Sequence, residues 1–446
     1  MTLEGFNVRV RVLMGSAASI NLFTARIKND RHAAAIDKLP DNNLLEIFNF
    51  CLGDFPEYRM TVQVIEHTSE WQRLVHVCQR WRRIIFESPR RLYLHLSCSS
   101  SSGTPVGKNL NIWPVTLPLT VDYNLDYDHV RLAPGDEHNM GAALKHPSRV
   151  HLIRIIVGSP LIRRVATLMQ RSYPALTSLD LKWNLGPSQD SGDVAVLVFP
   201  SRFLGGSAPN LQHLRLNSVP FPGLPTFLLS ARNLVTLKLK EIRQNGYISP
   251  EAMVGSLAVL TRLTTLSIAF FDEESLPEQR TRPTDPPMRT ILPALTDYHY
   301  RVCSDYLDDF LVQIDTPQLE SLRIECFLDQ IQASQLSRFI DRTETLRIEQ
   351  FRRAEVGFCS EDIFVGFDYP RGECRQARLS LKIMGLDWLE TQIPGVVGIL
   401  GQLAVVFPNV VHLFARGDHV GSAEIGLAEW LPFFRLISFC GSLAFI

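Results

Sequence analysis

The sequence predicts an α/β protein in which a small all-α module precedes an irregular solenoid, with parallel strands on the concave face and helices outside. Three observations support this. Apolar residues recur at helical spacing between residues 36 and 86. A leucine frame, P-x-L-x-x-L-x-L, then recurs along most of the remaining chain, and helix-start signals stand between its copies. We predict an N-terminal extension over 1–35, the helical module over 36–96, a linker over 97–112 and the solenoid over 113–446.

The composition is that of an ordinary globular protein. Of the 446 residues, 46% are hydrophobic, which is enough to build a large core. The formal net charge of −1 gives no reason to expect nucleic-acid binding. Eight cysteines are scattered without a C-x-x-C pair, so we expect reduced thiols in a cytoplasmic or nuclear protein, with no metal and no cofactor.

Three segments have features that bear on targeting or membrane insertion. The basic first 35 residues are compatible with a transit peptide or a loosely structured N-terminus, and we favour the second. Residues 393–415 lack charges but contain Pro394 and Pro408, which favours a short helix followed by a strand. Residues 431–446 are too short to span a bilayer and include Arg435. We therefore predict no membrane association.

The first helix of the module is expected to begin at Leu39-Pro40-Asp41. Proline loses no hydrogen bond at the first helical position, and an aspartate there complements the helix dipole. Apolar residues follow in helical register at Leu44, Leu45, Ile47, Phe48 and Cys51. Residues 53–56 (Gly-Asp-Phe-Pro) end the helix.

A second helix is expected to begin at Ser69 and to run without a break to Ser88-Pro89. Residues 69–72 (Ser-Glu-Trp-Gln) resemble a capping box. Apolar residues recur at Trp71, Leu74, Cys78, Trp81 and Ile85. Both helices are apolar over more than the stripe of about 100° that a small helix needs, and a module of some 50 residues buries little alone. We therefore expect a bundle that completes its core against another protein.

These residues resemble the F-box. The resemblance rests on Leu39-Pro40, on residues 44–48 (Leu-Leu-Glu-Ile-Phe) and on residues 74–82, which contain Val77, Cys78, Trp81 and Arg82. It implies docking on the adaptor that joins F-box proteins to the cullin scaffold of a cullin–RING ubiquitin ligase. The implied adaptor-binding residues are Leu39, Pro40, Leu44, Leu45, Ile47, Phe48, Leu74 and Val77, whereas Cys78 and Trp81 are expected in the core.

The stretch over 53–68 is longer than in a compact F-box, as is common among fungal-type F-box proteins. It leaves the middle helix of the motif open. A generic helical bundle remains the alternative.

The leucine frame is clearest at Pro174–Leu181. The first leucines of its copies lie at 176, 211, 234, 263, 295 and 319, with a looser copy from Pro408 and earlier strands expected at 92–96 and 150–156. Alternating leucines predict strands with one buried face, and Ser159-Pro160 and Ser249-Pro250 predict helix starts between them. Repeated strand–helix units give parallel strands, so this part resembles leucine-rich repeats. A non-repetitive α/β domain is the alternative.

Alternation also predicts which strand residues point away from the core. His213, Arg215, Lys238 and Lys240 would form a basic patch over two neighbouring repeats. With His299 and Arg323 they are our predicted target-binding residues, suited to an acidic or phosphorylated degron. A solvated face without a ligand is the alternative. The proline-rich residues 272–289 are expected to be a mobile excursion.

The sequence contains no P-loop, dinucleotide-binding turn, nucleophile elbow or H-E-x-x-H helix, which argues against an enzyme. The resemblances imply a non-catalytic substrate receptor of a ubiquitin ligase: the F-box would bind the adaptor and the repeats an unknown target protein. The alternative is a leucine-rich-repeat interaction scaffold without ligase function.

Overall fold

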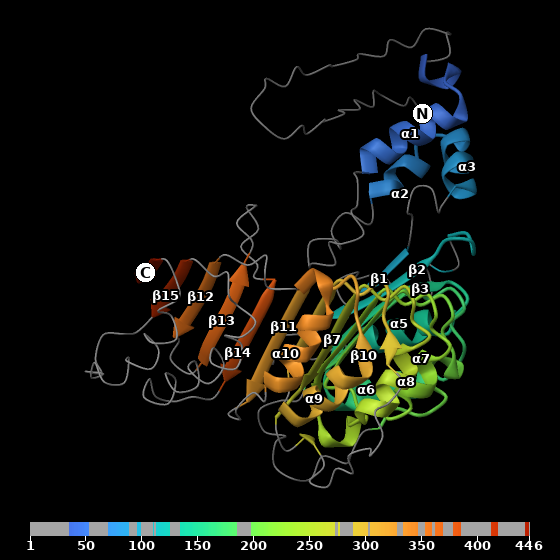
Figure 1. The fold of residues 1–446 in the computed structure, drawn as a ribbon. Coiled ribbons are helices and arrows are strands. Elements are labelled where there is room, and N and C mark those ends of the chain that lie inside the picture. Colours follow the sequence, from blue (N-terminus) through green and yellow to red (C-terminus); the bar gives the residue numbers. More distant parts are fainter. Residues whose placement is uncertain are drawn as a thin grey trace, which may run out of the picture. The chain divides into compact units, whose positions relative to one another are not determined.

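The computed structural model describes residues 35–52, 70–88, 96–99, 110, 113–124, 134–184, 198–272, 275–276, 289–301, 304–327, 333–346, 353–358, 362–368, 378–384, 412–417 and 442–445. The chain divides into two compact units, Met1–Leu92 and Tyr93–Ile446 (Figure 1).

The described part of the first unit is helical. It contains η1 (Ala35–Lys38), α1 (Asp41–Leu52), α2 (Glu70–Val75) and α3 (Gln79–Glu87). Leu44, Phe48 and Ile85 are fully buried, and the ring of Phe48 packs on that of Trp81 with centroids 4.7 Å apart. This unit therefore has an apolar core of its own.

The second predicted helix of the module is two helices. Cys78 adopts an extended backbone (φ −155°, ψ 170°) and is the N-cap of α3, where its Sγ accepts the Trp81 N–H at 3.4 Å. Arg82 Nε donates to the Val75 carbonyl at 3.0 Å and so satisfies a backbone acceptor at the end of α2. The prediction of one continuous helix was wrong, because apolar spacing continues across a break that the thiol and the guanidinium stabilise.

The second unit is built on a long, mostly parallel sheet. Its described strands are β1 (Leu96–Ser99), β2 (Leu119–Asn124), β3 (Val150–Val157), β4 (Ser178–Trp183), β5 (His213–Asn217), β6 (Thr236–Ile242), β7 (Thr265–Phe270), β9 (Asp297–Arg301), β11 (Ser321–Phe327), β12 (Arg353–Phe358), β13 (Asp362–Asp368), β14 (Leu379–Met384), β15 (His412–Gly417) and β16 (Ser442–Phe445). They lie side by side in chain order up to β11, followed by β14, β13, β12, β15 and β16. Of these, only β13 is antiparallel to its neighbours. Two short strands, β8 (Thr290–Ile291) and β10 (Ile314–Asp315), form a separate parallel pair.

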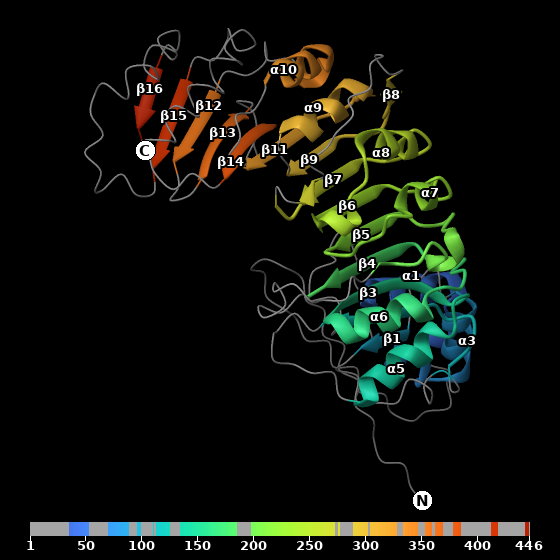
Figure 2. The same ribbon diagram turned by 90° about the horizontal axis from the view of Figure 1, so that it is seen from below.

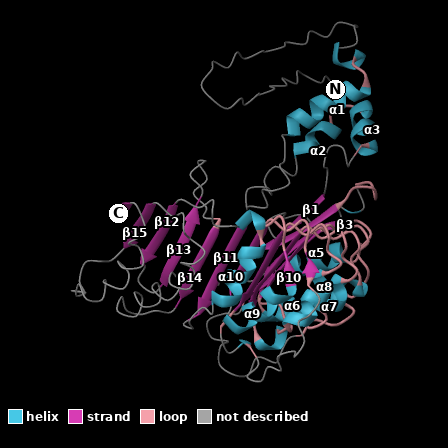
Figure 3. Cartoon of the chain, viewed as in Figure 1, coloured by secondary structure: helices cyan, strands magenta, loops and turns pink. Residues whose placement is uncertain are grey.

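Helices cover one side of this sheet (Figures 2 and 3). They are α5 (Pro134–Leu144), α6 (Ser159–Leu168), α7 (Leu224–Leu228), α8 (Pro250–Leu257), α9 (Ser304–Gln313) and α10 (Ala333–Arg342), with short 3₁₀ turns η3 (Phe203–Gly206), η4 (Gln244–Gly246) and η6 (Glu344–Leu346). Aromatic contacts between strand and helix illustrate the packing. Tyr298 of β9 lies against Phe310 of α9 with ring centroids 5.8 Å apart.

Alternation along the strands separates a leucine face from a polar face. On β4 to β7, Leu179, Leu214, Leu237 and Leu266 occupy equivalent register positions and are each at most 1% exposed. The residues that follow them on each strand point to the other side, which we call the polar face. The predicted α/β class with parallel strands and accompanying helices is confirmed.

Side chains outside the strands connect successive units. Thr264 Oγ1 donates to the Val235 carbonyl at 3.2 Å, and Thr296 Oγ1 donates to the Thr264 carbonyl at 3.2 Å. Asn210 Nδ2 and Asn233 Nδ2 each donate to the carbonyl of the proline that opens the preceding frame copy, at 2.8 and 2.9 Å. These bonds fix the starts of β5, β6, β7 and β9 relative to the preceding repeat.

The leucine frame predicted the strands well, and the boundaries less well. A strand follows each of the seven frame copies, and β3 covers the segment expected at 150–156. The strand expected at 92–96 falls mostly outside the described residues; Leu96 opens β1, which reaches Ser99 and pairs Leu96 with Leu119. Residues 97–99, predicted as part of the linker, belong to this strand, and the first compact unit ends at Leu92.

Several predictions concern segments that lie wholly or mostly outside the described residues. They are the extension over 1–35, the insertion over 53–68, the excursion over 272–289, and the apolar stretches over 393–415 and 431–446. Of the last two, the strands β15 and β16 are described. Within the described parts of the chain, no helix has the length and apolar character needed to cross a membrane.

The leucine face should dominate the stability of the second unit. Leu214→Ala removes a side chain that is 1% exposed at the centre of β5, and we expect it to lower the free energy of unfolding by about 2–5 kcal/mol. Gln212→Ala, an exposed position just before the same strand, is the control and should change little. Urea denaturation followed by circular dichroism gives both values, and equal effects would contradict the assignment of the two faces.

Candidate functional site

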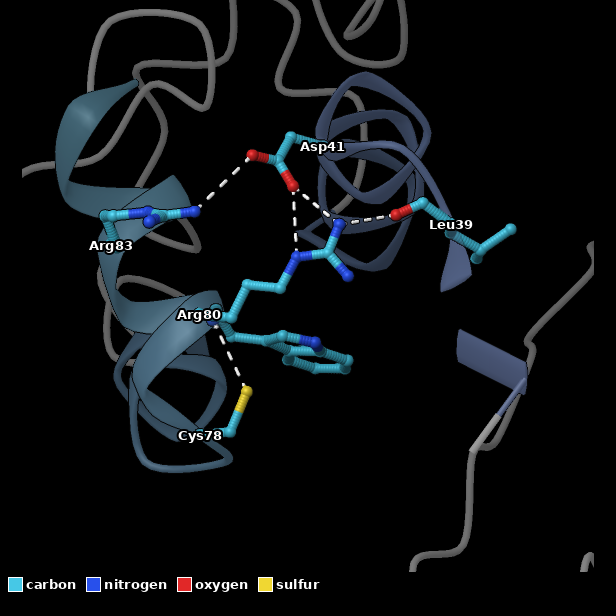
Figure 4. Close-up of polar contacts among 6 residues, drawn as sticks. Leu39, Asp41, Cys78, Arg80 and Arg83 are labelled. Atoms are coloured by element: carbon cyan, nitrogen blue, oxygen red, sulfur yellow. Dashed lines mark hydrogen bonds and ion pairs between the residues drawn. The ribbon is translucent and has the colours of Figure 1, made fainter. Parts of the chain in front are cut away.

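Arg80 of α3 holds the start of α1 in place (Figure 4). Its Nε and Nη2 donate to Asp41 Oδ1 at 3.1 and 2.6 Å, and Nη2 also donates to the Leu39 carbonyl at 2.5 Å. Asp41 is the first residue of α1, where a carboxylate also complements the helix dipole. One guanidinium therefore fixes the backbone on both sides of Pro40, in the segment that carries the leucine–proline motif.

The eight predicted adaptor-binding residues fall into two groups. Leu44, Leu45 and Phe48 are inside the unit, with exposed fractions of 0%, 6% and 0%. The others have accessible surface: Leu39 and Leu74 are half-buried, and Pro40, Ile47 and Val77 are exposed. In this structure, then, the first group forms the core and only the second can meet a partner.

Sequence reasoning missed two exposed apolar side chains in the same unit. Phe50 is 69% exposed and Ile36 is 36% exposed, compared with 37% for Ile47 and 58% for Val77. Phe50 lies three residues after Ile47, so both point to the same side of α1. We call Ile36, Ile47, Phe50 and Val77 the exposed apolar set. The signal was present in the helical spacing, which divides the apolar residues of α1 between two sides.

The polar face of the second unit carries a row of charged residues. Strand register aligns one residue from each of eight strands, in the order Asp122, Arg154, Asp180, Arg215, Lys238, Ser267, His299 and Arg323, from β2 to β11. We call these residues the central row. It includes four of the six predicted target-binding residues, while Lys240 lies two residues beyond Lys238 and His213 two residues before Arg215 on the same face.

Acids and bases alternate at the start of the central row. Arg154 lies between two carboxylates, with Nη1 3.7 Å from Asp122 Oδ2 and Nε 3.9 Å from Asp180 Oδ2. Arg215 Nη1 is also 3.9 Å from Asp180 Oδ2. Burial raises the pKa of both carboxyls; Arg154 opposes this at Asp122, and Arg215 and Arg154 oppose it at Asp180. Sequence reasoning did not identify Asp122 or Arg154 as members of this row.

The alternation of acidic and basic residues along the central row ends at β6. Neither Lys238 nor Lys240 forms an ion pair in the part of the chain that the structure describes. Burial lowers the pKa of Lys238, and Arg215, Lys240 and Arg323 lower it further, while Asp297 alone raises it. Three of the predicted target-binding residues, Arg215, Lys240 and Arg323, are thus close enough to act on the charge of a fourth, Lys238.

The two predicted histidines have different surroundings. His299 lies between Ser267 Oγ, 3.2 Å from its Nδ1, and Glu325 Oε1, 3.1 Å from its Nε2. The hydrogen bond to His299 lowers the pKa of Glu325, and Arg301 at 3.9 Å acts in the same direction. His213 is half-buried next to the central row, paired in register with Ser178 and Thr236. His299 is therefore already engaged within the protein.

The described residues offer little for metal chemistry. They include no group of three or more His, Cys, Asp or Glu side chains placed to hold a metal ion. Cys98 and Cys326 are buried thiols, and burial raises the pKa of the Cys98 thiol to about 11. Both features agree with thiols that are structural in this part of the chain.

Comparison with known proteins adds no relative. No protein-family model matches the chain, and no curated protein matches it.

Loss of the Arg80 contacts should loosen the start of α1. Arg80→Ala removes charge-assisted hydrogen bonds to Asp41 and to the Leu39 carbonyl, worth about 1.5–3 kcal/mol. We expect faster amide hydrogen exchange across α1. Arg83→Ala is a matched control, because that side chain is 62% exposed and 3.9 Å from Asp41, and a surface pair contributes about 0–1 kcal/mol. Similar exchange in the two variants would contradict the role given to Arg80.

Arg154→Met should destabilise the second unit in a pH-dependent way. The change leaves the buried Asp122 carboxylate and the half-buried Asp180 carboxylate without their shared cation, at a cost of about 3 kcal/mol near neutral pH. It also raises the folded-state pKa of both carboxyls further. A raised folded-state pKa gives stability that is present below the unfolded value of about 3.9 and is lost as pH rises through the folded value. The loss of unfolding free energy in Arg154→Met relative to the wild type should therefore be smaller at about pH 4 than at about pH 8.

Denaturant midpoints of the wild type and the variant at both pH values measure this difference. Adding Asp122→Asn to Arg154→Met should recover part of the loss at the higher pH. A deficit that is independent of pH would show that the ion pairs do not control these carboxyls.

Proposed function

We propose that this chain is a substrate-receptor subunit of a cullin–RING ubiquitin ligase, with the first unit serving as an F-box and the second as a leucine-rich-repeat receptor. The observation that carries the proposal is the exposed apolar set on helices that have the F-box-like sequence. Contiguous exposed apolar surface marks protein-binding sites, and Ile47 and Phe50 lie three residues apart on the same side of α1. Phe50, at 69% exposed, is the most accessible of them.

The proposed adaptor surface differs from the one expected from sequence. Ile47, Phe50 and Val77 are its centre, and Leu39, Pro40 and Leu74 lie within reach of solvent. Leu44, Leu45 and Phe48 would support these residues from inside the unit. Arg80 would contribute indirectly, since it fixes the backbone around Pro40.

The long parallel sheet supports the receptor half of the proposal. Repeated strand–helix units present an extended face on which a partner can bind across several strands. In this scheme the chain performs no chemistry itself: it brings target lysines close to a charged ubiquitin carrier and raises their effective concentration. Such a receptor would act in the cytoplasm or nucleus.

The adaptor complex can be tested with substitutions that spare the core. Ile47→Asp with Phe50→Asp places charge at two exposed positions of α1, and we expect loss of the complex when the variant is co-expressed with the adaptor of F-box-type ligases. Asn43→Asp adds charge at another exposed position of α1 and should leave the complex intact. Phe48→Asp is not informative, because burial of a carboxylate in this core would unfold the unit.

Co-purification and size-exclusion chromatography measure the outcome. If the wild-type chain forms no complex with the adaptor, the ligase proposal fails, and a repeat-based interaction scaffold without ligase function becomes the better description. Retention of the complex by the double variant would move the adaptor surface elsewhere.

A further inference from the structure

The charge pattern of the central row changes between β5 and β6. From β2 to β5 the row alternates acid and base, and each of its four charges has an opposite charge within 3.9 Å. From β6 to β11 the row contains Lys238, Ser267, His299 and Arg323, with no acid among them. The row therefore changes from alternating acids and bases to a segment that carries basic residues and no acid.

The nearby acids compensate this charge only in part. Asp297 on β9 acts on Lys238, but Arg215, Lys240 and Arg323 oppose it. Glu325 lies two residues beyond Arg323 on the same strand and is held by His299 at 3.1 Å and by Arg301 at 3.9 Å. Burial and neighbouring cations both disfavour the charged form of Lys238, so an anion placed here would relieve an existing repulsion.

Strand register sets the distance between the two ends of this cationic segment. Lys238 on β6 and Arg323 on β11 are separated by three strand steps, through β7 and β9. At roughly 4.8 Å per step the backbone positions of the two residues are about 14 Å apart. An extended peptide covers this distance in about four residues at roughly 3.4 Å each. The positions between them, Ser267 and His299, are polar and already bonded to each other at 3.2 Å.

We propose that this segment of the polar face binds an acidic, extended segment of a partner protein. One anionic group would contact Lys238 and Lys240, with Arg215 beside them, and a second, about four residues away, would contact Arg323. Carboxylates and phosphate groups both suit these donors, and Arg215 and Arg323 can each donate two parallel hydrogen bonds to one anionic group. Identifying the partner as the ligase target rests on the proposed function, but binding of the acidic segment does not.

A protein segment fits this site better than a nucleic acid. Nucleic acid presents closely and evenly spaced phosphates and requires a continuous basic surface. Here the cationic segment ends at the acid–base alternation of β2 to β5 on one side and adjoins Glu325 on the other. The net charge of the whole chain is −1. Discrete anions at a fixed spacing match this pattern.

The test uses the full chain and fluorescent peptides measured by anisotropy. The first peptide carries two adjacent glutamates and a third glutamate four residues on, in a serine–glycine background. A second has the same composition with all glutamates adjacent, and a third replaces the glutamates by phosphoserines. We expect the spaced peptides to bind at least about tenfold more tightly than the clustered one, and binding to weaken with added salt. The phosphoserine arm distinguishes the two sources of negative charge.

Charge reversal locates the site. Lys238→Glu with Lys240→Glu, and separately Arg323→Glu, should each weaken binding about tenfold or more. Lys145→Glu with Arg171→Glu changes the same charge at exposed positions outside the polar face and should have no effect. Lys238→Gln with Lys240→Gln provides a folding control: it should lose peptide binding while the melting temperature stays equal or rises, because a mutual repulsion is removed.

Each failure has a distinct meaning. Equal affinity for spaced and clustered peptides, unchanged binding by the lysine variants, or tighter binding of a single-stranded oligonucleotide than of any peptide would overturn the inference. Ile47→Asp with Phe50→Asp should leave peptide binding unchanged, and the lysine variants should keep the adaptor complex. Failure of the peptide site and failure of the ligase proposal are thereby separable.

Discussion

The parallel register between neighbouring strands is the constraint on which the second unit depends. Each strand from β3 to β11 aligns with the next so that large apolar residues stand beside large apolar residues and charged residues beside charged or polar residues. Hydrogen bonds from Thr264, Thr296, Asn210 and Asn233 hold the strand starts in that alignment. Because side chains alternate with a period of two, a slip by one residue would exchange the two faces of the sheet.

Both proposed binding surfaces follow from how the chain distributes its apolar residues. In the helical unit, Leu44 and Phe48 complete an interior together with Ile85, and Phe50 is left outside. In the sheet unit, the leucines take the helix side and leave the charged residues on the other. One unit thus offers an apolar surface and the other a charged one.

Much of the sheet could be predicted because its signal is local. Apolar residues that alternate within a frame copy identify a strand without knowledge of its neighbours, and the seven frame copies did so. Strands β12, β13 and β14 lack that frame, and their order in the sheet reverses, which no local pattern encodes. The break at Cys78 was missed for a related reason: apolar spacing is insensitive to a turn that a single side chain caps.

The proposed binding surfaces were predictable only in part. Strand alternation predicts that Arg215, Lys238, Lys240 and Arg323 all point away from the core, but the position of Arg323 three strand steps from Lys238 in one row depends on register. The Asp122–Arg154 ion pair joins the neighbouring strands β2 and β3 and likewise depends on their register. In α1, helical spacing shows two apolar sides but does not say which faces inward, and the interior proved to contain Leu44 and Phe48 instead of Ile47.

The threonine and asparagine contacts at the strand starts also bear on how such a chain can change in length. The first leucines of the frame copies stand 35, 23, 29, 32 and 24 residues apart, yet the strands align as if the repeats were equal. Insertions and deletions therefore fall in the segment between one strand and the next. The hydrogen bond from the next threonine or asparagine still aligns the start of the following strand. The insertion or deletion of one residue inside a strand would shift its register and has no such correction. We therefore expect differences in length among relatives to accumulate between strands and not within them.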